Sequence, residues 1–181
     1  MSPGFVIALL GAESTGKTTL AIDLGRVLAA RDRQVAVVGE ALREFCDREA
    51  RTPRRDEQAA IAAEQMRRIA AAAQSAEIVI ADTTALMIAV YSDLVFGDTS
   101  LYAAAEAEQR RYDLTLLTAL DLPWQADGLQ RDGPHVREPV DRQIRAALAR
   151  AGVAHEPIAG NGSSRLEAAL AAVDRAFAAR P

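Results

Sequence analysis

Apolar residues occur in short unbroken runs, separated by longer stretches in which they recur every three or four positions. The runs at 34–38, 78–81, 114–120 and 154–158, and the first at Phe5–Leu10, are continuous, which is typical of strands buried on both faces. The intervening periodicity predicts helices around 20–28, 41–50, 56–75, 84–95, 101–112, 140–151 and 166–177, with Asp56 capping the third. Such alternation predicts an α/β fold with a doubly wound, five-stranded parallel sheet in the order 2-3-1-4-5.

One segment interrupts this alternation. Residues 121–139 contain three prolines and two glycines and show no periodicity. A structureless stretch of this length is usually functional, so we expect a lid. The sequence shows no internal repeat and no linker, and we expect one domain over 1–181.

A phosphate-binding loop follows the first predicted strand. Residues 11–18 fit the P-loop pattern G-x-x-x-x-G-K-[ST], and a helical pattern comes directly after them. In this setting the backbone wraps around phosphate oxygens, Lys17 reaches the β- and γ-phosphates, and the Thr18 hydroxyl can ligate Mg²⁺. The pattern therefore predicts a P-loop NTPase that uses ATP and Mg²⁺. Its expected nucleotide contacts are Glu13, Ser14, Thr15, Gly16, Lys17, Thr18 and Thr19.

Acidic residues follow three further predicted strands. Glu40, Asp82 and Asp121 come just after the second, third and fourth strands. Because ligands of parallel sheets bind beyond the carboxyl ends of the strands, we expect these residues and the loop to meet in one crevice. Asp82 is the predicted second Mg²⁺ ligand. Glu40 is either a solvated acid at a helix start or a carboxylate that accepts the proton of a substrate hydroxyl; whether Glu40 or Asp82 is the base stays open. Arg43 lies one helical turn beyond Glu40.

Composition narrows the function classes. The net charge of −4 argues against a broad nucleic-acid-binding face. One cysteine, Cys46, and two histidines leave no internal disulfide and no zinc centre, so Cys46 is expected to be a small core residue. No apolar run reaches the roughly 20 residues of a membrane span, and the first residues contain no basic signal-peptide region. We expect a cytoplasmic protein that binds neither membrane nor nucleic acid.

Several pieces of the chain, taken in order, resemble a known family. Over about 6–174 the chain resembles the ribosylnicotinamide kinase domain of NadR-type proteins. The E-S-T-G-K-T-T version of the loop and the segment D-x-P-W-x-x-D-G-x-x-R at 121–131 are its most specific parts. The other matching pieces are Glu40 with Arg43, Gln65, Asp82 with Thr83, Tyr91, Tyr112 to Leu114, Arg137, and Gly160 with Arg165.

The resemblance implies a nucleoside-kinase-like fold and transfer of phosphate from ATP to the 5′-hydroxyl of nicotinamide riboside, giving nicotinamide mononucleotide. It places adenine near Arg165. Arg131 and Arg137 become candidate lid arginines; the alternative is solvated loop arginines. Trp124 either anchors the lid or offers its face to the cationic pyridinium ring of the substrate. The implied substrate-binding residues are Glu40, Arg43, Asp82, Tyr91, Asp121, Trp124 and Asp127.

Two other functions fit the same motifs. One is phosphorylation of a different nucleoside or small alcohol. The other is a nucleotide-dependent accessory ATPase or switch without a small-molecule acceptor. A kinase should divert ATP to an acceptor, whereas a switch should need a partner surface; the lid segment favours the kinase. The expected partner is a small-molecule substrate, and a homo-oligomer is possible.

Overall fold

The structure is a computed structural model that describes residues 3–125 and 133–180. Strands and helices alternate along it. The strands are β1 (Phe5–Leu10), β2 (Val35–Val38), β3 (Ile78–Asp82), β4 (Leu114–Thr118) and β5 (Glu156–Ile158). The helices are α1 (Lys17–Ala29), α2 (Ala41–Glu49), α3 (Gln58–Ser75), α4 (Ala85–Phe96), α5 (Tyr102–Gln109), α6 (Arg137–Ala151) and α7 (Gly162–Ala178), with short 3₁₀ turns η1 (Arg55–Glu57) and η2 (Pro134–Val136).

The described strands form one parallel sheet in the order β2-β3-β1-β4-β5, which confirms the predicted fold class and strand order. The first strand lies at its centre. Ile7 is in register with Ile80 of β3 on one side and with Leu114 of β4 on the other. The carboxyl ends of β1, β3 and β4 therefore lie together at one edge of the sheet.

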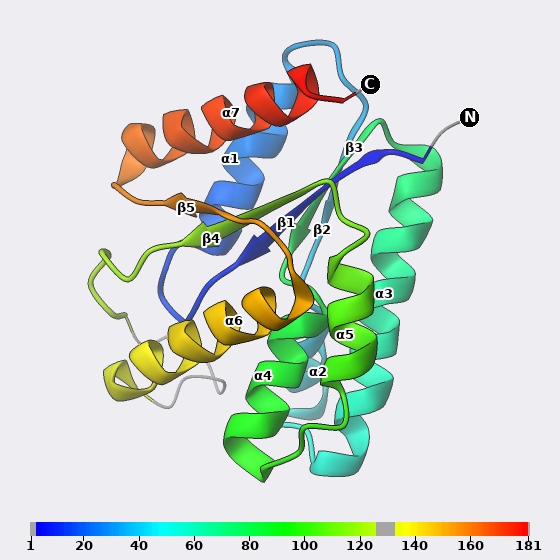
Figure 1. The fold of residues 1–181 in the computed structure, drawn as a ribbon, viewed down its shortest axis with the longest axis vertical. Helices are drawn as coiled ribbons and strands as arrows, with labels where there is room; N and C mark the ends of the chain where they lie inside the picture. Colours follow the sequence, from blue (N-terminus) through cyan, green and yellow to red (C-terminus); the bar gives the residue numbers. More distant parts are fainter. Residues whose placement is uncertain (1–2, 126–132, 181) are drawn as a thin grey trace.

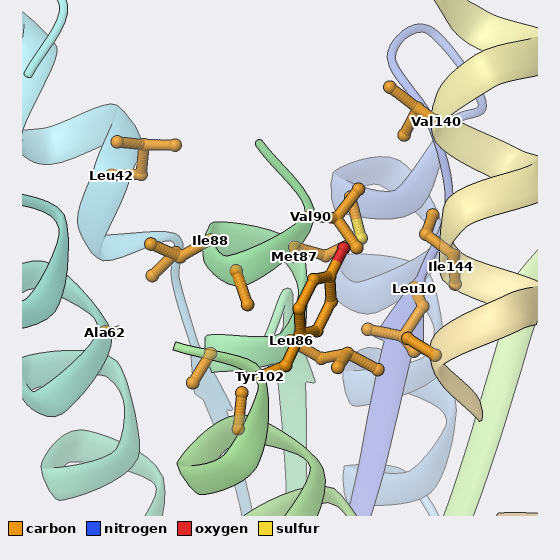
Figure 2. Close-up of a cluster of buried hydrophobic side chains, with 14 of the residues drawn as sticks. Leu10, Leu42, Ala62, Leu86, Met87, Ile88, Val90, Tyr102, Val140 and Ile144 are labelled. Carbon is orange, nitrogen blue, oxygen red and sulfur yellow. The ribbon is translucent and has the colours of Figure 1, made fainter. Parts of the chain in front are cut away.

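Helices cover both faces of this sheet, with α1 and α7 on one face and α3, α4, α5 and α6 on the other (Figure 1). Side chains alternate along β1 because successive residues of a strand point to opposite faces. Ile7 and Leu9 pack with α1 and α7, whereas Leu10 belongs to the cluster of α4 and α6. Figure 2 shows that second cluster, in which Leu10 lies beside Ile144 and Leu86.

Several predicted boundaries were wrong. The third helix begins at Gln58, and Asp56 lies in η1 and does not cap it. On that helix Ile61 and Gln65 are buried, whereas Ala59 is exposed. The sixth helix begins at Arg137, three residues earlier than expected, so the irregular segment is shorter than 121–139. Pro139 is tolerated there because the N–H groups of a first helical turn have no partner within the helix.

Two expectations from composition can be compared with the structure. Within residues 3–125 and 133–180, no helix is both long and apolar enough to cross a membrane. Cys46 is buried on α2, as expected of a small core residue, and it also borders the cleft described below.

Candidate functional site

The phosphate-binding loop connects β1 to α1 at the carboxyl edge of the sheet. Gly16 occupies the N-cap of α1 with φ of 76°, a left-handed conformation that glycine adopts at little cost. Gly11 has φ of 152°, and a Cβ atom there would lie 2.0 Å from the Thr118 hydroxyl oxygen. The two glycines of the motif are therefore required by backbone conformation and by the close approach of β4.

Buried hydroxyl groups support the loop from beneath. The Thr15 hydroxyl donates to the carbonyl of Ala12 at 2.8 Å, and the Thr118 hydroxyl lies 2.7 Å from that of Thr15. Both threonines are fully buried. Because a buried polar group is costly to leave unpaired, this small network fixes the loop to the end of β4.

Lys17 and Thr18, at the start of α1, bond to the loop itself and to the carboxyl end of β3, respectively. The Lys17 ammonium donates to the carbonyls of Gly11 and Ala12, at 2.8 Å each. The Thr18 hydroxyl donates to Asp82 Oδ2 at 2.6 Å. Asp82 is buried, and its Oδ1 has no hydrogen-bond partner among the described residues. Hydroxyl and carboxylate oxygens are the ligands that Mg²⁺ prefers, so this pair fits the predicted metal ligands.

Glu40 lies at the N-cap of α2 but does not cap it. Its side chain makes no hydrogen bond to the helix N–H groups, and it is 14% exposed. Burial raises the pKa of this carboxyl, and the Asp82 charge raises it further, while Lys17 and Arg43 lower it. The Arg43 Nε atom lies 3.7 Å from Glu40 Oε2. Glu40 is therefore a carboxylate held in a partly desolvated site beside the phosphate loop.

A cleft of about 1060 Å³ lies beside the loop, and Lys17, Thr18 and Glu40 border it. The predicted residues Asp82, Trp124 and Arg137 are not among the residues that line it. Of the predicted site residues, the loop residues Glu13 to Thr19 line it, as do Glu40, Arg43 and Tyr91. Sequence reasoning missed further lining residues from α2 and α4. Their signal was helical spacing, since Cys46 and Asp47 lie three or four positions from Arg43, and Met87 lies four before Tyr91. The other missed residues are Leu42, Thr83, Leu122, Pro123, Gln125 and Asn161.

Asp121 and Arg165 face each other behind the loop. The Arg165 guanidinium is buried and donates to Thr15 O at 2.6 Å, to Gly160 O at 2.8 Å and to Asp121 Oδ1. Asp121 Oδ2 accepts the Gly160 N–H at 2.6 Å. Neither residue is among those that line the cleft. Their expected contacts with acceptor and adenine stay predictions, while the observed contacts link the loop to the start of α7.

The segment 121–125 lies against the phosphate loop. Ser14 Oγ donates to Gln125 O at 2.8 Å, and Gln125 N donates back to Ser14 Oγ at 3.2 Å. Arg137 is buried and donates from Nη1 to Leu122 O at 2.9 Å. The indole Nε1 of the half-buried Trp124 has no hydrogen-bond partner among the described residues. The predicted site residues Asp127 and Arg131 lie outside the described residues.

The fold and the site together define a protein of the P-loop NTPase fold, in which the loop joins the central strand of a parallel sheet to α1. A family model described as an AAA domain matches residues 6–165, and the chain belongs to that family. No curated protein matches the chain.

Among solved structures, two crystal structures of NadR protein have similar folds. One is a complex with NAD and AMP-PNP and the other a complex with NR. Each has a TM-score of 0.77 and 20% sequence identity, and each match covers 98% of this chain. The chain spans about half of each NadR chain, 51% and 50% respectively. The resemblance predicted from sequence is thus confirmed at the level of the fold.

Proposed function

We propose that the protein is a kinase that transfers the γ-phosphate of ATP to a hydroxyl group of a nucleoside, with nicotinamide riboside as the preferred acceptor. The observation that carries the proposal is the position of Glu40. A partly buried carboxylate with a raised pKa lines the same cleft as Lys17 and the phosphate loop. In this position Glu40 can accept the proton of an acceptor hydroxyl that attacks the γ-phosphate.

The extent of the cleft leaves room beyond the phosphate loop. Ligand pockets have volumes of about 300–1,000 Å³. At about 1060 Å³ this cleft lies at the upper end of that range, and it extends from the loop to Tyr91 on α4. The loop end fits a nucleoside triphosphate, and the end bordered by α2 and α4 is left for an acceptor.

The chemical roles follow from the contacts. Lys17 and the loop amides hold and neutralise the phosphates, as in-line transfer requires. Thr18 and Asp82 would hold Mg²⁺, which supplies further neutralisation of the phosphate charge. Since Asp82 is bonded to Thr18 on the metal side, we assign the proton to Glu40. The acceptor oxygen forms a bond to the γ-phosphorus, the bond to the bridging oxygen of ADP breaks, and the hydroxyl proton passes to Glu40.

Arg137 is proposed to contact the transferred phosphoryl group. Its Nε and Nη2 atoms are buried without a hydrogen-bond partner among the described residues. Buried unpaired donors are rare, and an anionic oxygen would satisfy them. Arg131 and Asp127 are proposed to act with it, on the basis of the sequence resemblance alone.

The acceptor end has features that suit a cationic aromatic ring. Glu40 and Asp47 provide carboxylates, Tyr91 provides an aromatic ring, and Leu42 and Met87 provide apolar surface. A positively charged ring is attracted by carboxylates and by aromatic faces. Trp124 is proposed as a second aromatic contact. A NadR structure of the same fold is a complex with NR, which agrees with this choice.

The match to an AAA domain favours one alternative, a nucleotide-dependent ATPase that needs no small acceptor. The two functions separate in a single assay. The protein is incubated with ATP and Mg²⁺, alone and with a panel of nucleosides, and the products are identified by mass spectrometry. Formation of nicotinamide mononucleotide with matching ADP supports the proposal. Equal ADP release with and without every acceptor would replace it with the ATPase.

A further inference from the structure

Gln65 is a fully buried amide on α3 that the proposed chemistry does not use. Among the described residues, its side chain makes three hydrogen bonds. Oε1 accepts the Ala41 N–H at 2.8 Å, and Nε2 lies 3.2 Å from both Gly39 O and Thr83 O. One side chain therefore connects the carboxyl ends of β2 and β3.

The first two contacts fix the backbone on both sides of Glu40. The Ala41 N–H, at the first position of α2, is satisfied by Gln65. The carboxylate of Glu40 makes no capping bond to α2, and Glu40 lines the cleft.

The third contact holds a strained residue next to Asp82. Thr83 has φ of 84°, in a left-handed region that a β-branched residue rarely adopts. Such a conformation persists only where surrounding bonds enforce it. Its N–H donates to Leu9 O at 3.2 Å, and its carbonyl accepts from Gln65. Asp82, the preceding residue, is thus held in reach of Thr18.

We infer that Gln65 is a positioning residue that fixes Glu40 and Asp82 relative to one another at the neighbouring carboxyl ends of β2 and β3. The inference rests on the proposed function, in which these carboxylates serve the acceptor hydroxyl and the metal. Within residues 3–125 and 133–180, the side-chain hydrogen bonds of Gln65 go to the segments after β2 and β3 and not to the phosphate loop. Its loss should therefore affect the transfer step more than the binding of ATP.

The kinetic test uses Gln65→Met, which keeps the volume and removes the hydrogen bonds. We expect kcat to fall by at least about tenfold, as for a lost positioning contact, with the KM for ATP nearly unchanged. In a Glu40→Gln background the same change should lower kcat by a smaller factor than in the wild type, because the part of the effect that passes through Glu40 is already lost and only the part through Asp82 remains. Equal fold-losses in both backgrounds would overturn the inference.

Gln109→Met is the matched control. Gln109 is also fully buried, and its amide connects the hydroxyl groups of Thr84 and Thr115. Its loss should lower the melting temperature and leave kcat unchanged when measured well below that temperature. A drop in kcat equal to that of Gln65→Met would mean that any buried amide has this effect, which would overturn the positioning role. If Gln65→Met does not fold, Gln65→Asn, too short to bridge both segments, replaces it in each assay.

Amide hydrogen exchange tests the geometry without any acceptor. In Gln65→Met the Ala41 N–H should exchange at least about tenfold faster, because it has lost its acceptor, while amides of α7 stay unchanged. An unaltered Ala41 rate would overturn the inference. If Ala41 responds as expected and the wild type phosphorylates no acceptor, the proposed function fails and the connection made by Gln65 stands.

Discussion

The buried guanidinium of Arg165 allows a sharp prediction, because it connects three parts of the chain. Arg165→Leu keeps an apolar stem and removes the bonds to Thr15 O, Gly160 O and Asp121. We expect this variant to lose stability and, through the freed Thr15 carbonyl, to hold the phosphate loop less firmly. If Arg165 served only to contact adenine, the variant would lose affinity for ATP without losing free energy of unfolding.

The magnitude follows from burial. Removing one member of a fully buried ion pair costs about 3–5 kcal/mol. The Arg165 side chain is 5% exposed but that of Asp121 is 36% exposed, so water can partly restore the stranded carboxylate. We therefore take the lower end, about 3 kcal/mol. At roughly 2–4 °C per kcal/mol for a chain of this size, the melting temperature should fall by about 6–12 °C.

The assay is urea unfolding of the wild type, Arg165→Leu, Asp121→Asn and the double variant. The cycle should give a coupling energy of at least about 1 kcal/mol, since the two residues share one contact. Arg175→Leu is the control on the same helix, because its ion pair with Glu156 is exposed at 62% and 46% and should contribute less than about 1 kcal/mol. The reasoning would be refuted if Arg165→Leu lost no more free energy of unfolding than Arg175→Leu and bound an ATP analogue more weakly. Arg165 would then be a nucleotide contact.

Three further predictions concern the cleft. Lys17→Ala should lower kcat by the equivalent of about 3–4 kcal/mol of transition-state stabilisation, with an unchanged circular dichroism spectrum; near-normal turnover would defeat the proposed role. Glu40→Gln should lower kcat and yet raise the melting temperature at pH 7, because the raised pKa of Glu40 means that its ionised form destabilises the fold. In thermal melts at several pH values, this gain in melting temperature should vanish as the pH falls below 4.5, the ordinary pKa of a glutamate. A gain that persists at lower pH would contradict this cause. Trp124→Ala should raise the KM for nicotinamide riboside more than for an uncharged nucleoside, by the equivalent of about 0.5–2 kcal/mol, with partial recovery in Trp124→Phe; equal losses would mean that Trp124 reads no charge.

The sheet could be predicted from sequence because its three central strands, β1, β3 and β4, are buried along their whole length. The continuous apolar runs of β1 and β3 have the length of a buried strand and are too short for a buried helix. The loop motif in addition indicates where β1 ends. The boundary of α6 could not be predicted in the same way. The sequence analysis includes Pro139 in the irregular segment 121–139, although proline in a first helical turn loses no hydrogen bond. Local pattern therefore fixed which elements exist better than where they begin.

The candidate site shows the same division. Lys17, Thr18 and Asp82 could be named from the motif and from strand ends, because those positions follow from the chemistry of phosphate binding. The pairing of Asp121 with Arg165 could not, since it joins residues 44 positions apart on elements whose relative orientation only the packed fold defines. Sequence locates charged residues near a site but does not show toward which side of it they turn.

The central place of β1 has a consequence for how the chain is made. The phosphate-binding motif is complete in sequence by Thr18, yet its support comes much later in synthesis. The Thr118 hydroxyl beneath Thr15 lies 103 positions away, and β1 gains its second neighbour only with β4. Contacts between such distant positions form slowly, after the intervening chain has been ordered. A nascent chain that has not yet reached Leu114 therefore contains the entire motif but not the strand that supports it. Nucleotide binding should be one of the last properties that the folding protein acquires.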